Sequence, residues 1–324
     1  MSSQGDRFET LVGVVVRAAQ LNGSALTLVD LLQLLQPGTT SEQLAQEFES
    51  HPRLSKEYAM SEGFVVGRVG SHPSVGDHDE RQNYFVVNVR AAKWLSERLG
   101  EAVIVAVSGS TSYKTATHKD DVDLFCVTRG EEMWVFLARA LILTRVSRLL
   151  DRSRAPICLS CVMDESYARK LFGSDRGALF ARDALVAEVV LGRERYNSLL
   201  ESAPWIGRYF PKLYGLKLST RGRWKGTDAA RSSWTRVANL FLFVTLGSYI
   251  RAKAHLHNKL LAKQGKGLSL FHVRIDLDHL VYESAKYLRL REMYDEIQPI
   301  PGEVHGRIAS GGLLEPMWRP NEAR

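Results

Sequence analysis

The sequence predicts an α/β fold in which one small α/β unit, residues 83–168, lies between two helical regions, residues 1–82 and 169–324. Three observations predict it. The middle of the chain reads in the order helix, strand, turn, strand, helix, strand, which is typical of a compact layered unit. The first part carries helix-capping signals ahead of short apolar segments. Beyond residue 168 the apolar residues recur mainly at helical spacing.

The composition is that of an ordinary globular protein. The chain has 324 residues, of which 45% are hydrophobic and 24% are charged, so it is long enough for two or three domains. Charged residues interrupt the apolar segment 8–21, which argues against a signal peptide. The uncharged run 237–250 is shorter than the roughly 20 residues of a membrane span, so a buried helix is expected. The chain has 3 cysteines, an odd number that predicts no disulfide framework and fits the cytoplasm.

The N-terminal region, residues 1–82, is predicted to be helices followed by a strand. Thr27 and Thr40 each precede an acidic or amide residue by three positions, Asp30 and Gln43, which is the pattern of a capping box. Residues 63–69 are predicted to form a strand, and the polar, glycine-containing stretch 70–82 a linker. Helices followed by a strand hairpin are typical of a winged-helix domain and also of small packing domains. Both interpretations stay open, and no basic recognition helix supports DNA binding.

The middle unit carries the motif with the most chemistry. Strands are predicted at 102–107, 121–128 and 157–163, with helices at 83–99 and 131–150. The turn Ser108-Gly109-Ser110 follows the first strand, and Asp121 and Asp123 lie ten residues later at the start of the second. Residues two apart on a strand point to the same side, so this pair presents two carboxylates from one face. The sequence therefore predicts a divalent metal site.

The turn beside this pair predicts phosphate binding. A glycine lets the backbone approach a ligand closely, and the turn offers amide groups and the Ser110 hydroxyl to an anion. Lys114, four residues after Ser110, is a further candidate contact to phosphate, with an exposed surface lysine as the alternative. A metal site next to a phosphate site indicates nucleotide chemistry.

The same residues resemble the signature of the DNA polymerase β-like nucleotidyltransferase superfamily. The chain is similar to small bacterial nucleotidyltransferases in which this core, with its small mixed sheet, is flanked by helical regions. The resemblance implies that Gly109 and Ser110 hold the triphosphate and that Asp121 and Asp123 hold Mg²⁺ or Mn²⁺. It also implies a third carboxylate on the next strand, and the candidate there is Asp164, at the end of strand 157–163.

Other metal chemistry is not predicted. Cys158 and Cys161 lie three apart in a strand-like run, a spacing that sends them to opposite faces, and no second pair completes a zinc site. They are interpreted as small buried hydrophobic residues.

The C-terminal region, residues 169–324, is predicted to be all-helical, with the clearest helices at 179–191, 229–253 and 273–290. It is strongly basic, since residues 207–274 contain 14 Lys and Arg against one Asp. Aromatic residues interleaved with these cations are typical of RNA binding, so RNA or another polyanion is an expected partner. The alternative is that the aromatic residues pack a helical core.

Together these features predict a cytoplasmic, metal-dependent nucleotidyltransferase that moves a nucleoside monophosphate from a nucleoside triphosphate, ATP being the expected donor, to a hydroxyl acceptor. No membrane partner is expected, and the acceptor and the oligomeric state stay open. Two other classes stay open as well. One is a degenerate nucleotidyltransferase fold that binds nucleotide as a sensor. The other is a nucleic-acid-binding regulator.

Overall fold

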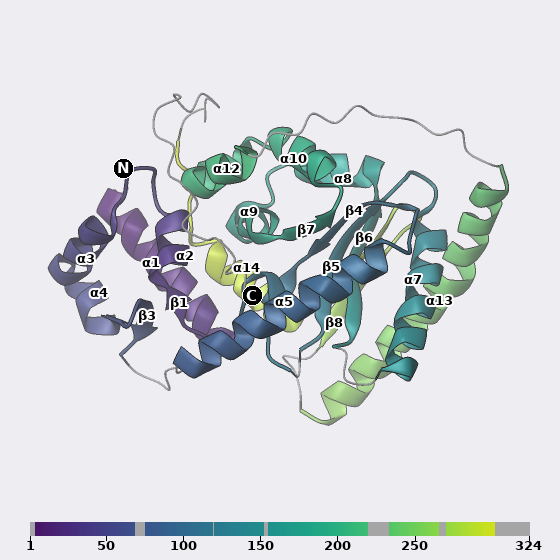
Figure 1. Cartoon of the computed structure of the whole chain (residues 1–324), viewed down its shortest axis with the longest axis horizontal. Coiled ribbons are helices and arrows are strands. Elements are labelled where there is room, and N and C mark those ends of the chain that lie inside the picture. The colour runs from purple at the N-terminus through teal and green to yellow at the C-terminus, as the bar shows by residue number, and fades with distance from the viewer. Residues whose placement is uncertain are drawn as a thin grey trace, which may run out of the picture.

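The computed structural model describes residues 4–68, 75–118, 120–151, 155–219, 233–265 and 270–301. Its centre is a six-stranded mixed sheet with the strand order β7-β4-β5-β6-β9-β8 (Figure 1). The strands are β4 (Ala102–Val107), β5 (Val122–Thr128), β6 (Ile157–Asp164), β7 (Glu188–Leu191), β8 (Phe271–Ile275) and β9 (His279–Ser284). The α/β character predicted from the sequence is confirmed.

Only one pair of neighbouring strands in this sheet is parallel. β5 runs parallel to β6, whereas β4–β5, β4–β7, β6–β9 and β8–β9 are antiparallel. The parallel pair requires a crossover, which α7 (Met133–Leu150) provides. The connection between β4 and β5 contains the single-turn helix α6 (Gly109–Ser112), so the predicted Gly-Ser turn lies at the end of β4.

The two faces of the sheet have separate hydrophobic cores. One core combines inward residues such as Val105, Leu124 and Val162 with α5 (Val75–Ser96), α7 and α13 (Ser233–Lys263). The other core contains Ala106, Val127 and residues of six helices. These helices are α8 (Glu165–Phe172), α9 (Gly177–Val186), α10 (Arg193–Glu201), α11 (Trp205–Tyr209), α12 (Pro211–Leu218) and α14 (Ala285–Tyr294). Side chains that alternate along β5 therefore point to opposite cores.

The N-terminal region packs against this second core. It contains α1 (Gln4–Leu21), α2 (Leu28–Leu34), α3 (Ser41–Ser50), α4 (Pro52–Glu57) and a three-stranded antiparallel sheet β1-β3-β2, formed by Leu26–Thr27, Phe64–Gly67 and Tyr58–Ser61. The predicted caps are present: Thr27 accepts a hydrogen bond from the Asp30 amide, and Thr40 forms a capping box with Gln43. The predicted strand at 63–69 is β3, which forms a hairpin with β2 that was not predicted, and the winged-helix interpretation stays a prediction.

Four expectations about secondary structure are wrong in whole or in part. The C-terminal region is not all-helical, because β7, β8 and β9 complete the central sheet. The predicted helix 273–290 is instead the hairpin β8–β9 followed by α14, and the predicted helix 179–191 ends at Val186, where β7 follows. The stretch 70–82 is not a linker throughout, since α5 begins at Val75, and residues 70–74 lie outside the described part of the chain.

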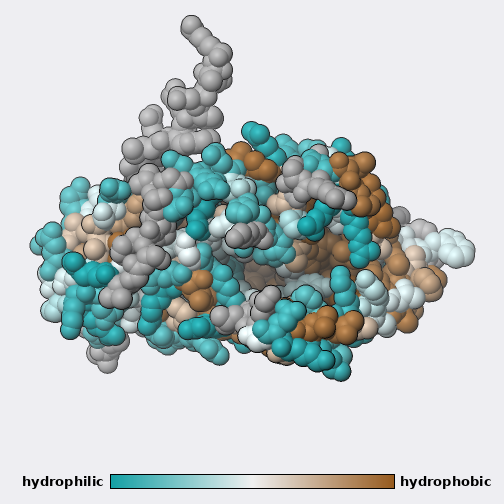
Figure 2. Space-filling model, turned by 90° about the horizontal axis from the view of Figure 1, so that it is seen from below, coloured by the Kyte–Doolittle hydropathy of each residue, from teal (hydrophilic) through white to brown (hydrophobic). Residues whose placement is uncertain are grey.

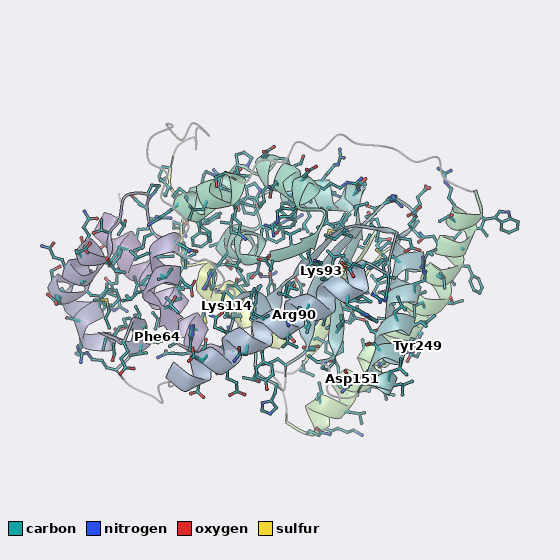
Figure 3. All side chains as sticks on the ribbon, viewed as in Figure 1. Phe64, Arg90, Lys93, Lys114, Asp151 and Tyr249 are labelled. Carbon is teal, nitrogen blue, oxygen red and sulfur yellow. The ribbon has the colours of Figure 1, made fainter. Side chains whose placement is uncertain are left out.

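Apolar residues are exposed on α7 and α13, and the face seen in Figure 2 shows brown residues at the end of the molecule where these helices lie. Figure 3 labels one of the exposed residues, Tyr249 of α13, which is 50% exposed. Other exposed residues of these helices are Ile142, Val146, Leu149, Trp234, Val237 and Phe241. No helix in the described part of the chain is long and apolar enough to cross a bilayer. Residues 237–250 form part of helix α13, as predicted, but the helix is not fully buried, because one of its sides faces solvent.

Candidate active site

The structure brings Asp121 and Asp123 together. Asp123 lies in β5 and Asp121 immediately precedes that strand, so the two side chains share a face. Their carboxylate oxygens and the sulfur of Cys158 all lie within 4.8 Å of one another. Asp121 is exposed and Asp123 is partly buried, so the pair is reachable from solvent on one side. The arrangement offers two oxygen ligands to one cation, as the spacing predicted.

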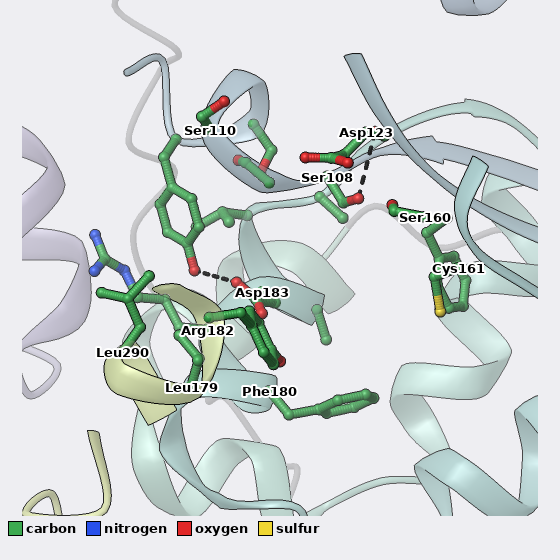
Figure 4. A pocket seen from close by; sticks show the side chains of 18 of the residues that line it. Ser108, Ser110, Asp123, Ser160, Cys161, Leu179, Phe180, Arg182, Asp183 and Leu290 are labelled. Atoms are coloured by element: carbon green, nitrogen blue, oxygen red, sulfur yellow. Dashed lines mark hydrogen bonds between the residues drawn. The ribbon is translucent and has the colours of Figure 1, made fainter. Parts of the chain in front are cut away.

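The Gly-Ser turn lies directly against Asp123. The backbone N–H of Ser108 donates to the carbonyl oxygen of Asp123 over 2.9 Å, and the Ser108 hydroxyl donates to the same atom over 3.3 Å (Figure 4). Gly109 has a φ of +61°, and a Cβ built there would lie 2.3 Å from Oδ2 of Asp123. Only glycine fits this position, both for its backbone and for the carboxylate that occupies the side-chain space.

Helix α5 supports the turn from the other side. The Asn88 side-chain amide donates to the Thr111 hydroxyl over 3.4 Å, and the Arg81 guanidinium donates to the carbonyl oxygen of Thr115. Lys114, which has a φ of +56°, places its Nζ 5.7 Å from the centre of the Phe85 ring of α5 (Figure 3). Lys114 lines the cavity beside the turn, so the structure places this predicted phosphate ligand at the site.

Burial dominates the electrostatics of the carboxylate pair. Loss of water around Asp123, together with the negative charge of Asp121, raises the pKa of Asp123 to about 7. Hydrogen bonds from Ser160 and Cys158 act in the opposite direction and only partly offset this increase. A cation bound between the two carboxylates would lower this pKa, because its positive charge favours the ionised form of both groups.

Cys158 and Cys161 do not point to opposite faces, which corrects the expectation from their spacing. Asp123 pairs with Cys158 and Phe125 with Cys161, so two steps along β5 match three along β6. This β-bulge adds one residue and returns Cys161 to the side of Cys158, and both line the cavity. Burial, followed by the charges of Asp123 and Asp121, raises the pKa of the Cys158 thiol.

Asp164 does not lie at the site, which corrects its expected role as a base or metal ligand. It pairs with Thr128 at the opposite end of the two parallel strands, six residues along β6 from Cys158. Its side chain caps α8 by accepting a hydrogen bond from the backbone N–H of Tyr167 over 2.8 Å. The residue that β6 pairs with Asp123 is Cys158, so among the described residues no third carboxylate joins the cluster.

A cavity of about 800 Å³ opens between the carboxylate pair, the N-terminal region and helices α9 and α14. Its floor is apolar and aromatic, with Phe125, Phe172 and Tyr196 in edge-to-face contact at centroid distances near 6 Å and Phe180 beside them (Figure 4). Its polar lining includes cations on α9, β8 and α14, namely Arg176, Arg182, Arg274, Lys286 and Arg291. A nucleotide has a size that such a cavity can hold.

A second polar group in the cavity was not predicted from the sequence. The Tyr113 hydroxyl donates to the Asp183 carboxylate, and Tyr287 also bonds to it (Figure 4). Burial raises the pKa of Asp183 to about 6, which these hydrogen bonds and Arg182 partly offset. One signal was available in the sequence: Arg182 and Asp183 are adjacent charges inside the otherwise apolar helix 178–186. Such charges indicate a buried polar cluster.

Asp276, Asp278 and His279 form a second group of metal-ligating side chains in the turn between β8 and β9. Nδ1 of His279 lies 2.7 Å from Oδ1 of Asp278, and the His279 ring stacks on Tyr167. The contacts within this turn explain why the three side chains lie close together. The turn lies next to Asp164, whose backbone N–H donates to the carbonyl oxygen of Asp278, and not beside Asp123.

The basic and aromatic residues predicted to bind a polyanion do not all lie free on the surface of the described structure. Arg236 pairs with Glu131, Arg208 with Asp175 and Arg274 with Glu283. Five of the basic residues lie outside the described part: Arg221, Arg223, Lys225, Arg231 and Lys266. Four of the interleaved aromatic residues are buried in the helical core, namely Trp205, Tyr209, Phe210 and Tyr214. Those four support the packing alternative, and binding of RNA or another polyanion stays a prediction.

A comparison of this chain with protein-family models, characterised proteins and solved structures finds no match. The resemblance to the nucleotidyltransferase superfamily therefore depends on the residues themselves. It covers the turn at Gly109 and the pair Asp121 and Asp123, whose arrangement in space has just been described.

Proposed function

We propose that this protein is a metal-dependent nucleotidyltransferase that transfers a nucleoside monophosphate from a nucleoside triphosphate to a hydroxyl group. The observation that carries the proposal is the contact between Gly109 and Asp123. The turn that would hold the triphosphate is in direct contact with a carboxylate pair that would hold the cation. A phosphate on the turn would therefore share its cation with Asp121 and Asp123.

The residues of the pair suit Mg²⁺ or Mn²⁺. Both ions prefer oxygen ligands, and Asp121 and Asp123 supply carboxylate oxygens within 4.8 Å of one another. Burial and, after it, the charge of Asp121 raise the pKa of Asp123, and a divalent cation bound between the two carboxylates would stabilise their ionised forms. When bound, such an ion neutralises charge on the phosphates and lowers the barrier to attack at the α-phosphorus.

The residues of the chain would bind and orient the donor. The turn supplies backbone N–H groups and the Ser110 hydroxyl to the β- and γ-phosphates, and Lys114 adds a positive charge beside them. The aromatic floor around Phe125 and Phe180 offers a stacking surface to the base. ATP is the donor we favour for the first test.

A second candidate function is a nucleotide sensor that binds the nucleotide without transferring it. The specific observation in its favour is that Cys158, a thiol, occupies the position paired with Asp123 on β6, the neighbouring strand on which the resemblance implies a third carboxylate. A protonated thiol cannot accept the proton of an attacking hydroxyl as a carboxylate does.

Replacing both aspartates with asparagine, Asp121→Asn with Asp123→Asn, is expected to abolish transfer. The double variant keeps the shape of the site but removes both negative charges, so cation affinity should fall by at least about 100-fold. Purified protein would be incubated with α-³²P-labelled nucleoside triphosphates, Mg²⁺ or Mn²⁺, and separate pools of RNA, protein and small-molecule acceptors. Label on an acceptor and released pyrophosphate are the two readouts.

The control for this experiment is Asp79→Asn, which makes the same chemical change on the exposed surface of α5. It should transfer label as the wild type does. Transfer that survives in the double variant would refute the enzymatic proposal. Tight binding of the nucleotide with Mn²⁺, without pyrophosphate from any pool, would favour the sensor.

A further inference from the structure

Arg182 carries a buried positive charge for which the described residues provide no ion pair. The residue lies in α9, is 8% exposed and lines the cavity. Other arginines of the described chain have carboxylate partners, for example the exposed Arg274 with Glu283 and the partly buried Arg195 with Glu165. Arg182 makes no direct ion pair with a described carboxylate, although the charge of the neighbouring Asp183 acts on it from nearby.

The groups in contact with Arg182 are aromatic and neutral. Its guanidinium lies 4.6 Å from the centre of the Tyr113 ring and 5.6 Å from that of Tyr294, and Nη1 donates to the Tyr294 hydroxyl. Its Nε is buried and donates to no acceptor in the described structure. The Asp183 carboxylate already accepts hydrogen bonds from Tyr113 and Tyr287.

Such a charge is costly to bury without a counterion. Ring contacts offset part of the cost, but they supply less than a paired carboxylate or phosphate does. An arginine held rigidly between aromatic rings at the wall of a cavity is also pre-organised, because its planar fork needs little further ordering to bind an oxyanion. The structure therefore lacks one partner at this point of the cavity.

We infer that Arg182 binds an oxyanion, a carboxylate or phosphate group, of a second small molecule that occupies the cavity together with the nucleotide. This inference depends on the proposed function in one respect: the second molecule is the hydroxyl acceptor. The acceptor is then a small anionic compound that carries a hydroxyl group. A polymer is not required, because the oxyanion site lies inside the cavity rather than on the surface.

The position of Arg182 separates this oxyanion from the phosphates of the donor. In Figure 4 Arg182 and Leu290 lie on one side of Asp183, and Ser108, Asp123 and Ser160 lie on the other. The triphosphate would occupy the turn beside Asp123. Additional cations near the Arg182 end come from α14, where Lys286 and Arg291 also line the cavity.

The test measures oxyanion binding by isothermal titration calorimetry, with inorganic phosphate and malonate as probes and Mg²⁺ with a non-hydrolysable ATP analogue present at saturation. At least one probe should bind the wild type. Its affinity should fall by at least about tenfold in Arg182→Gln, and by less in Arg182→Lys, which keeps the charge but loses the fork. The matched control is Arg193→Gln, because Arg193 is about half exposed, at 48%, pairs with Glu188 and does not line the cavity, so this variant should bind the probes as the wild type does.

Three results would overturn the inference. The first is that neither probe binds the wild type. The second is that the saturating analogue excludes both probes, which would assign Arg182 to the phosphates of the donor. The third is that Arg182→Gln binds the probes as tightly as the wild type does. Circular dichroism and an unchanged affinity for the ATP analogue would show that Arg182→Gln is folded. If Arg182→Gln does not fold, Tyr294→Phe serves as the second variant: it removes the hydroxyl that contacts Arg182 but keeps the guanidinium, so it should still bind the probe. The double variant Asp121→Asn with Asp123→Asn should still bind the oxyanion when the ATP analogue is omitted. A wild type that binds the oxyanion but transfers label to no acceptor pool would refute the proposed function alone.

Discussion

Gly109→Ala should abolish cation binding at the candidate site and destabilise the protein. The new Cβ would lie 2.3 Å from Oδ2 and 3.1 Å from Cβ of Asp123, a separation at which one of the two must move. The φ of +61° adds strain for any residue with a side chain, roughly 1–3 kcal/mol. Displacing the carboxylate should lower the affinity for Mn²⁺ by at least about 100-fold.

The affinity would be measured by electron paramagnetic resonance of free Mn²⁺, and the free energy of unfolding by urea denaturation. Gly100→Ala is the matched control, because nothing lies within 4 Å of a Cβ at that position. It should leave both quantities close to the wild-type values. If Gly109→Ala bound Mn²⁺ normally, the turn could not be in contact with the cation site, and the argument from this contact would fail.

Asp123→Asn should abolish cation binding and yet stabilise the protein at alkaline pH. The Asp123 carboxyl has a pKa of about 7 in the folded protein, well above its ordinary value near 3.8, so the fold favours its neutral form. Above pH 7 the ionised group destabilises the fold, by up to about 4 kcal/mol for this difference in pKa. Asparagine resembles the neutral acid and removes the cost.

The sign of the pH dependence follows from the same values. Between pH 4 and pH 7 the folded protein binds more protons at Asp123 than the unfolded chain does, so the wild type should gain stability as the pH falls through this range. Urea unfolding in EDTA at pH 5.5 and pH 8 measures this gain. In Asp123→Asn this contribution should disappear, whereas Asp79→Asn should keep it. A wild type that loses stability from pH 8 to pH 5.5 while Asp123→Asn does not would contradict the prediction.

Addition of Mn²⁺ at pH 8 should stabilise the wild type, since a cation that binds only the folded state shifts the unfolding equilibrium. The shift should be absent in Asp123→Asn and in Gly109→Ala. Thermal unfolding with and without Mn²⁺ distinguishes this effect from a general effect of salt, for which Na⁺ at the same ionic strength is the control.

Much of the fold could be predicted because the signals were local. Strands 102–107 and 157–163 are continuous apolar runs bounded by turn residues, and both are strands in the structure. Thr40 and Gln43 cap α3 with a reciprocal pair of hydrogen bonds that four residues of sequence specify. Asp121 and Asp123 share a face because a spacing of two on a strand always has this effect.

The edge of the sheet formed by the C-terminal region was missed. Residues 271–275 alternate between partly buried and exposed side chains, the period of a strand, but Val273, Leu277 and Leu280 also recur at helical spacing. Only pairing with β6 distinguishes the two, because the hydrogen bonds that make 279–284 a strand come from a segment more than a hundred residues earlier.

The sequence by itself determined the carboxylate pair and the glycine turn, because strand periodicity and the backbone freedom of glycine act over a few residues. The tertiary structure alone decided which residues complete the site. A β-bulge places Cys158 and Cys161 on one side, strand register moves Asp164 to the far end of β6, and the packing of α9 against α14 encloses Arg182 without a carboxylate partner among the described residues. These outcomes depend on contacts between distant segments, which no local pattern encodes.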